Sequence, residues 1–498
     1  MAWSVPSGAE AGDVAARGAL AGFRRELFRC LPLRRDALFC LADAVLCSGG
    51  RVTDLARLSL VPEFGRGHGA LYDALNEGVV DFGRVRWLLA GMPLPQWGDG
   101  RIRLAVDVCD WLRPDAEASP GRAFCHVRRR GKDGGERVAG WPYSFVAALG
   151  PGPSSWAPLL DAARLGPDDD DCEVTAAQLR EVLSRLRAAG RWRDGDPDVI
   201  VAADAGYSAT GLELLLAGLP FTFVTRVRCD RVFYRPAPPK EQGTRGVQAR
   251  YGEPVRCAEE ATWHSPGIRQ QGGPSRLGAV AVAAWPGLRV KVSRHTAGLQ
   301  DWPQDTMLPR VEGTLILVRG SRAARPVWLW SSEADPGEDL VRSLWQAYLR
   351  RFDIEHVFRF LKQQLGWNRP LLRDPAAADR WTWLIIACYA QLWLARRLAA
   401  VTRLPWQPPQ PPGQMTPGRV RAGFRRARQA TWIPASETRT RAPGPGRPKG
   451  SKNARKAPRY PVGKTRPKDP RHPASQTKPQ KTPGKHEGPT APVRLNGK

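Results

Sequence analysis

Residues 102–112, IRLAVDVCDWL, alternate between apolar and other side chains in a way that predicts a β-strand. Four apolar residues recur at every second position: Ile102, Leu104, Val106 and Val108. Because successive side chains of a strand point to opposite faces, these four would share one face and Asp107 would project from the other. The pattern therefore predicts a strand that packs one face on a core and presents a carboxylate on the other.

Further apolar runs predict the elements that follow this strand. Two strands are expected in FCHVRRR and GWPYSFVAALG, a helix at about 174–190, a buried strand in DVIVAADAGYS that ends at Asp204, a helix in ATGLELLLAG, and a strand in FTFVTRVR. This alternation is typical of an α/β domain. In a mixed sheet with the first and fourth of these strands adjacent, Asp107 and Asp204 would meet.

A β-rich insertion is predicted at about 230–330. Its strand-like runs are RLGAVAVAAW, LRVKVSRH, GTLILVRG and RPVWLWSS. The insertion separates the predicted α/β elements from a late helix.

The segment 347–367, AYLRRFDIEHVFRFLKQQLGW, predicts that helix of about five turns, because it contains no Pro and no Gly before Gly366. At about 100° per residue, a polar stripe falls inside an arc of roughly 80°. Its members are Tyr348, Arg351, Glu355, Arg359 and Lys362. A solvated face with helix-spaced ion pairs, each contributing only ~0.2–0.5 kcal/mol, is the plainer interpretation of this helix alone.

Residues 1–95 are predicted to be a small helical domain. Thr53 is a candidate cap of a short helix, and GRGHG is a candidate turn before a second helix that ends at Gly78. This outline resembles a helix-turn-helix, and an ordinary small helical domain fits it equally well.

The chain from about 405 to 498 is Pro-rich and basic with few apolar residues, so we expect it to be disordered. Just before it, RWTWLIIACYAQLWLARRL at 380–398 is apolar but contains Tyr389 and Gln391. We interpret it as a core helix and not as a membrane span.

The formal net charge of +28 favours a polyanionic partner, most simply nucleic acid. Residues 441–498 hold 16 Lys and Arg against Asp469 and Glu487, which is about half of the excess. A membrane surface is the competing partner, but no basic amphipathic helix with an aromatic face supports it. Nine cysteines without a CxxC pair indicate reduced thiols in a cytoplasmic protein, and the histidines show no zinc spacing.

Three acids stand out against this basic background: Asp107, Asp204 and Glu355. A helix packed across the ends of the first and fourth strands would add Glu355 to the two aspartates. Three converging carboxylates repel each other unless a cation lies between them. Carboxylate ligands suit Mg²⁺ or Mn²⁺, and two such ions ~3.5–4 Å apart perform phosphoryl chemistry.

These residues resemble those of a DDE transposase of the bacterial insertion-sequence type. The resemblance rests on the spacing Tyr348-x2-Arg351-x3-Glu355-x6-Lys362, a Y-R-E-K signature, and on Asp204 after an apolar strand. It covers roughly residues 20–400. It implies an RNase-H-like catalytic domain at 96–404 with the β-rich insertion, preceded by a helical DNA-binding domain at 1–95 and followed by the basic tail.

The resemblance also implies a function and a set of roles. Asp107, Asp204 and Glu355 would be catalytic and would hold two Mg²⁺ or Mn²⁺ ions. The enzyme would hydrolyse phosphodiesters at the ends of its own insertion sequence and transfer the 3′-OH ends into target DNA. Its partners would be double-stranded DNA and a second copy of the chain, without a membrane, and it would be associated with the nucleoid. A catalytically silent, DNA-binding descendant is the alternative.

Roles in DNA binding follow from the same resemblance. Arg351 and Lys362 would grip phosphates near the cut, and Tyr348 would contact the DNA backbone. Some members of the group stack a flipped base on a Trp of the insertion. The candidates here are Trp263, Trp285, Trp302, Trp328 and Trp330.

Two features complete the candidate residues. The run Asp107-Val108-Cys109-Asp110 departs from the family pattern at Val108 and offers Asp110 as a rival first ligand; we prefer Asp107 because Asp110 would point to the opposite face of a regular strand. In the tail, GRPKGSK around Arg447 resembles an AT-hook, which binds the narrow minor groove of A·T-rich DNA. A generic basic tail is an equal alternative.

Overall fold

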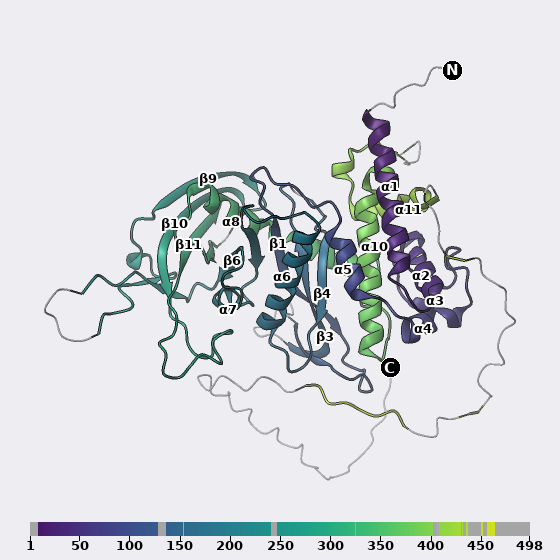
Figure 1. The fold of residues 1–498 in the computed structure, drawn as a ribbon, viewed down its shortest axis with the longest axis horizontal. Helices are drawn as coiled ribbons and strands as arrows, with labels where there is room; N and C mark the ends of the chain where they lie inside the picture. The colour runs from purple at the N-terminus through teal and green to yellow at the C-terminus, as the bar shows by residue number, and fades with distance from the viewer. Residues whose placement is uncertain are drawn as a thin grey trace, which may run out of the picture.

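The computed structural model describes residues 8–127, 136–152, 154–240, 247–323, 325–401, 406, 408–429, 431, 435–436, 450–451 and 456–463. Two halves lie side by side in Figure 1, a large twisted sheet and a group of helices around the long helix α10. No helix among these described residues is long and apolar enough to cross a membrane.

The strands within the described ranges form one mixed sheet. In spatial order they are β2 (Ala123–Val127), β3 (Glu136–Ala148), β1 (Arg103–Leu112), β5 (Val199–Ala203), β6 (Phe221–Val227), β12 (Val327–Ser331), β11 (Val311–Gly320), β10 (Gly278–Val290), β7 (Val232–Tyr234) and β8 (Pro254–Arg256), while β4 (Leu159–Arg164) pairs with β3 and β9 (Ile268–Ser275) pairs with β10. Most of the pairs are antiparallel, but β1, β5 and β6 run parallel to one another.

The predicted contact between the first strand and the strand that ends at Asp204 is confirmed. β1 pairs with β5 in parallel, with Ala105 opposite Ala202. Asp107 and Asp204 each lie two residues beyond this pair, so the register brings them to the same edge of the sheet.

The insertion is β-rich as predicted, but it extends the same sheet. β12 pairs with β6, with Trp328 opposite Val227, and β11 and β10 follow. LRVKVSRH is not a separate strand, because Leu288 to Val290 end β10 after a register shift that begins at Trp285. Strand β4 was not predicted; its half-polar sequence LLDAAR lacks a clear alternation.

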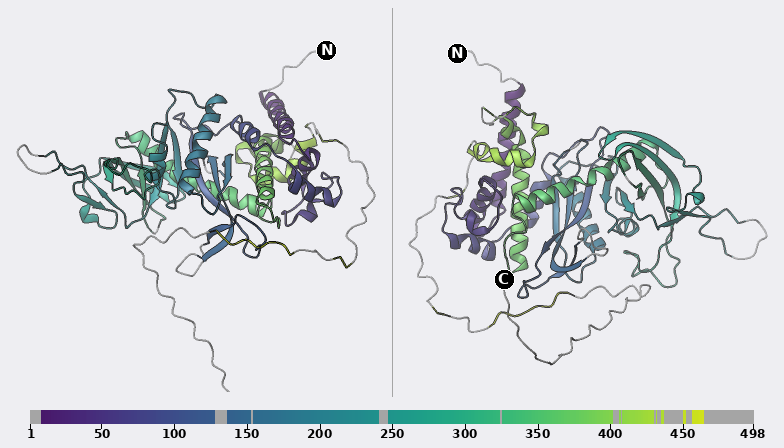
Figure 2. Two further views of the ribbon diagram at one scale, coloured as in Figure 1. Left: turned by 60° about the horizontal axis from the view of Figure 1, so that its bottom comes forward. Right: turned by 180° about the vertical axis from the view of Figure 1, so that it is seen from behind.

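The helices are α1 (Gly8–Arg29), α2 (Arg35–Cys47), α3 (Leu55–Leu58), α4 (His68–Glu77), α5 (Phe82–Ala90), α6 (Asp171–Ala188), α7 (Ala209–Leu215), α8 (Glu338–Arg351), α9 (Asp353–Gln363), α10 (Pro375–Val401) and α11 (Pro417–Gln429), with short 3₁₀ helices at Glu260–Thr262 and Pro412–Gln414. The N-terminal segment is helical as predicted. Its helices α1, α2 and α4 pack against α10, which comes from the other end of the chain. Seen from behind, α8 and α9 run across the sheet toward α10 (Figure 2).

The outline of a helix-turn-helix does not match the N-terminal helices. α3 is a single turn whose cap is Asp54 and not Thr53, since the Asp54 carboxylate accepts from the Arg57 N–H at 2.8 Å. The connection to α4 spans residues 59–67, where that motif has a turn of three to four residues. The predicted end of α4 at Gly78 is correct.

The expectation of a disordered tail from 405 onward is wrong for two segments. Residues 417–429 form α11, because Val420 and Phe424 share one helix face and are fully buried beside α10. Residues 456–463 lie along the loop after β1, where the Tyr460 N–H donates to the Glu117 carbonyl at 2.8 Å. Arg447 lies outside the described residues.

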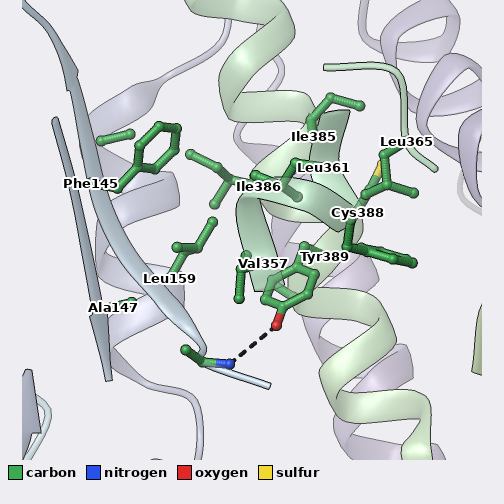
Figure 3. Packing of buried hydrophobic residues seen from close by; sticks show 14 of the residues in the cluster. Phe145, Ala147, Leu159, Val357, Leu361, Leu365, Ile385, Ile386, Cys388 and Tyr389 are labelled. Carbon is green, nitrogen blue, oxygen red and sulfur yellow. Dashed lines mark hydrogen bonds between the residues drawn. The ribbon is translucent and has the colours of Figure 1, made fainter. Parts of the chain in front are cut away.

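The helix α9 is held between the sheet and α10. Val357 and Leu361 of α9 meet Phe145 of β3 on one side and Ile385 and Ile386 of α10 on the other (Figure 3). In the same layer the hydroxyl of Tyr389 in α10 accepts a hydrogen bond from the Ala157 N–H, before β4, at 3.2 Å. The predicted core helix at 380–398 is thus part of a buried layer that fixes where α9 lies on the sheet.

Candidate active site

Three elements deliver the three predicted acids to one place. Asp107 projects from β1, Asp204 directly follows β5, and Glu355 lies in the first turn of α9. The single helix predicted over 347–367 is in fact two helices, α8 and α9, which meet at Phe352. Arg351 is the last residue of α8, so the junction places a cation and an acid from successive helices over the same sheet edge.

The guanidinium of Arg351 lies among the three carboxylates. Its Nη1 is 2.7 Å from Asp107 Oδ2, while its Nη2 is 3.4 Å from Glu355 Oε1 and 3.7 Å from Asp204 Oδ1. The Arg351 side chain is only 8% exposed, whereas the side chains of Asp204 and Glu355 are about 40% exposed. One buried cation therefore partly neutralises three acids that open toward solvent.

Burial and charge oppose each other at this cluster. Burial raises the pKa of Asp107 to about 6; Arg351 works against this rise, and the negative charges of Asp204 and Glu355 add to it. Burial alone would lower the pKa of Arg351, but Asp107 and Asp204 outweigh it, so that the pKa is raised. Arg351 therefore stays positively charged. Asp107 is the least exposed of the three acids, and its burial is the main cause of its raised pKa.

The donor set fits a hard divalent cation. A groove of about 450 Å³ opens over Asp107, Asp204 and Glu355, and Arg359 and Lys362 line it further along α9. Carboxylate oxygens of this kind suit Mg²⁺ or Mn²⁺. The three carboxylates are not drawn together within 4.8 Å of one another; the described residues meet that spacing only at Asp170, Asp171 and Cys172.

That second acidic group has a structural explanation. Asp170 caps α6, its Oδ1 accepting from the Cys172 N–H at 2.8 Å and from the Glu173 N–H at 3.3 Å. The acidic run DDDDC at 168–172 is therefore the N-terminus of a helix.

Asp110 does not join the cluster around Arg351. Burial raises the pKa of Asp110, while the Cys125 thiol and the Lys362 ammonium lower it. The Nζ of Lys362 lies 5.8 Å from the ring centroid of Trp367, and its charge acts on Asp110. Asp107, and not Asp110, lies in the cluster with Asp204 and Glu355, although Asp110 also lines the groove.

Tyr348 is 4% exposed and lies beneath the cluster, where burial raises its pKa. Arg351, Asp204, Arg226 and Arg276 are the charged groups that act on it. The expected contact of Tyr348 with a DNA backbone would therefore be limited to the edge of its ring or hydroxyl.

Arg276 is a site residue that the sequence did not reveal. It comes from the turn between β9 and β10, and its guanidinium lies 4.7 Å from the ring centroid of Phe352, at the junction of α8 and α9. Burial lowers its pKa, and Tyr348, Arg351 and Glu355 are close enough to influence it. No local motif marks Arg276, since only the pairing of the insertion with the sheet brings it here.

Most of the insertion tryptophans proposed for base stacking are core residues. Trp285, Trp328 and Trp330 are at most 4% exposed, and Trp263 packs edge-to-face on Trp328 at 5.0 Å. Trp302 alone among the five lies in a loop outside this core, half-buried. His356, next to Glu355, packs edge-to-face on Phe352 at 5.2 Å.

Comparison with known proteins adds an independent line of evidence. Residues 26–285 match the family described as DDE superfamily endonuclease. The match contains Asp107 and Asp204, which lie two residues beyond the last pair between β1 and β5, and it ends before Glu355. No curated protein matches the chain. Since the family match spans more than half of the sequence and includes two of the three clustered acids, the chain belongs to the DDE superfamily endonucleases.

Proposed function

We propose that this chain is a transposase of the bacterial insertion-sequence type, in the group with the Y-R-E-K signature. It would bind the ends of its own element, cut phosphodiesters there and transfer the 3′-OH ends into target DNA. The observation that carries the proposal is the meeting of Asp107, Asp204 and Glu355 around Arg351 at one groove, in a chain that belongs to an endonuclease family.

Asp107, Asp204 and Glu355 are the residues that would hold two Mg²⁺ or Mn²⁺ ions. Ions of this kind supply activation of the attacking oxygen and stabilisation of the leaving oxygen in an in-line displacement. The packing of α9 between the sheet and α10 fixes the position of Glu355 relative to Asp107, so that the three side chains would stay close enough to share the ions.

The bases along the groove would bind the DNA backbone. Arg359 and Lys362 line it beside the acids. Arg276, from the insertion, lines a neighbouring cavity beside Phe352 and is close enough to act on Arg351 and Glu355. Guanidinium groups bind phosphate oxygens through two parallel hydrogen bonds, so these side chains would position the scissile phosphate near the carboxylates. Together with the net charge of +28, they support double-stranded DNA as the substrate and a nucleoid-associated protein.

The finer assignments are part of the same proposal. The catalytic domain would have the RNase-H-like arrangement and would span about 96–404, with DNA-binding helices at 1–95. A homodimer would pair the two ends of the element. Arg447 and its neighbours would add salt-dependent affinity for A·T-rich DNA.

The decisive experiment incubates the purified chain with a plasmid carrying its gene and native flanks, in Mg²⁺ and in Mn²⁺. The wild type should produce breaks that map to the element ends, and Glu355→Gln should reduce them at least about 100-fold, because loss of a direct ligand should cost more than loss of an outer partner. The matched control is Glu338→Gln, the same exchange at an exposed position in the first turn of α8.

The outcome separates the two functions. Breaks that persist in Glu355→Gln would contradict the proposed site. DNA binding without cleavage in either metal would instead favour a catalytically silent, DNA-binding descendant, and Val108 would be the first departure from the family pattern to examine.

A further inference from the structure

We propose that Arg351 is an internal counter-cation that holds the metal-binding carboxylates in the free protein and leaves them for a DNA phosphate, so that metal binding depends on bound DNA. This inference rests on the proposed function and adds a regulation of the same site. It also differs from the role expected for Arg351 as a phosphate ligand alone.

The first step is the position of the guanidinium. Its two terminal nitrogens contact all three acids, at 2.7 Å from Asp107, 3.4 Å from Glu355 and 3.7 Å from Asp204. A cation that bridged the three carboxylates would need these same oxygens. Arg351 and a divalent ion therefore compete for the same ligands while Arg351 holds this conformation.

The second step is the charge balance. Asp107, Asp204 and Glu355 would repel one another at this distance without a cation. Arg351 carries one positive charge against their three, since a guanidinium is not deprotonated in proteins. The free cluster is thus stable enough to persist but retains an excess of negative charge that still attracts a cation.

The third step is the place of Arg351 in the fold. It is the last residue of α8, beside the junction at Phe352, and the acids around it open into the groove that Arg359 and Lys362 line. A phosphate bound in that groove offers a guanidinium two oxygens in the geometry of a carboxylate. DNA can therefore draw Arg351 off the acids with little loss of hydrogen bonding, and the acids then need a new cation.

This exchange couples the two ligands. DNA should tighten the binding of the divalent ion, and by linkage the ion should tighten the binding of DNA by the same factor. An enzyme built in this way would complete its metal centre on DNA.

The test measures Mn²⁺ binding by electron paramagnetic resonance of free Mn²⁺, with and without a short duplex from the gene's native flank. The proteins are the wild type, Arg351→Gln, Arg351→Lys and the control Arg342→Gln, which removes a half-exposed arginine of the same helix. Glu355→Gln with the same duplex supplies the baseline for Mn²⁺ bound by the DNA itself.

Without DNA, Arg351→Gln should bind Mn²⁺ at least about 10-fold more tightly than the wild type, because its competitor is gone. The duplex should tighten Mn²⁺ binding by the wild type and by Arg342→Gln, and much less by Arg351→Gln. Arg351→Lys, whose single ammonium cannot contact three acids at once, should fall between. Circular dichroism and thermal unfolding establish whether each variant is folded. If Arg351→Gln does not fold, the Mn²⁺ affinity of Arg351→Lys tests the inference in its place.

Two results would overturn the inference. One is Mn²⁺ binding that is unchanged or weaker in Arg351→Gln and Arg351→Lys without DNA, which is the result expected if Arg351 only positions the acids. The other is an equal gain from DNA in all variants. Both leave the proposed function standing as long as the wild type binds Mn²⁺ through Glu355, whereas the absence of any Glu355-dependent binding would defeat the metal-dependent function itself.

Discussion

Two clusters of this molecule both combine arginine with acidic side chains, but they differ in the ratio of positive to negative charges. In the helical half, Asp43 of α2 accepts from Arg24 at 2.7 and 3.0 Å and from Arg428 of α11 at 2.7 Å. Gln391 of α10 accepts from Arg24 as well, at 2.7 Å. The Arg24 and Asp43 side chains are 0% and 2% exposed. Asp43 thus has two arginines for one acid. Around Arg351 the acids are in excess instead, with three acids for one arginine at an open groove.

The difference separates a structural cluster from a functional one. Around Asp43 both carboxylate oxygens accept hydrogen bonds from arginines, although Arg24 Nε has no partner among the described residues, and the cluster ties α1, α2, α10 and α11 together. Burial of such charges is tolerated because each finds a partner. Around Arg351 the excess of negative charge is not neutralised by the arginine and faces the groove. This excess lowers the stability of the fold and creates affinity for a cation. An imbalance of charge in a cleft is therefore a better sign of function than the presence of ion pairs.

The largest effect that this comparison predicts is on stability. Asp43→Ala leaves Arg24 buried without its carboxylate and should lower the free energy of unfolding by about 3–5 kcal/mol. Urea unfolding followed by circular dichroism measures it. Asp339→Ala is the control, since that acid is 99% exposed and its ion pair at 3.8 Å should contribute no more than about 1 kcal/mol. A loss below about 1 kcal/mol in Asp43→Ala would remove the distinction between the two clusters.

The next effect is on metal binding and compares two acids of one strand. Asp107→Asn should weaken Mn²⁺ binding to the DNA-bound protein by at least about 10–100-fold, because it removes a direct ligand. Asp110→Asn, three residues along β1, should change it less than about threefold, since Asp110 interacts with the Cys125 thiol and the charge of Lys362 and forms no ion pair with Arg351. Isothermal titration of both variants decides which acid is the ligand, and the reverse ranking would make Asp110 the first ligand.

The smallest effect concerns a half-buried acid with no cation partner among the described residues. Burial raises the pKa of Glu213 in α7 to about 8 from an ordinary value of 4.5, and its Oε2 has no hydrogen-bond partner among the described residues. Between these two pH values the folded chain binds a proton that the unfolded chain releases, so the contribution of Glu213 to stability falls as the pH rises.

Glu213→Gln removes this titration. The variant should gain stability over the wild type as the pH rises from 5 to 8.5, by on the order of 1 kcal/mol at the upper end, less than the full shift implies because the side chain is half-buried and solvent screens its charge. Thermal unfolding at both pH values measures the gain. A constant difference between the two proteins at all pH values would indicate that Glu213 is ionised in the fold and paired.

Local patterns were enough to predict the strands β1, β5 and β6, the helices α6 and α7, and the buried helix at 380–398. The alternation around Asp107 and the apolar run before Asp204 each depend on a few neighbouring residues, and parallel pairing of the two strands then follows from α/β topology. The prediction that the polar residues from Tyr348 to Lys362 share the face of one helix is wrong, because the break at Phe352 leaves Tyr348 and Arg351 on α8 and the others on α9.

Other features arise from contacts between distant segments. α11 forms in a basic, Pro-rich region because Val420 and Phe424 find a surface on α10, and β12 joins β6 across a hundred intervening residues. Arg276 reaches the site only because the insertion continues the sheet. Propensity in one segment cannot register such contacts, since their free energy comes from burial against a partner.

The sequence by itself determined that three acids and a row of bases would occupy a strand, a strand end and a helix face, because periodicity and residue type are local properties. Only the tertiary structure decided that Arg351 lies among the acids and not along the row of bases. That choice depends on the angle at which α8 meets α9 over β1, which is set by the packing of Val357 and Leu361 between the sheet and α10.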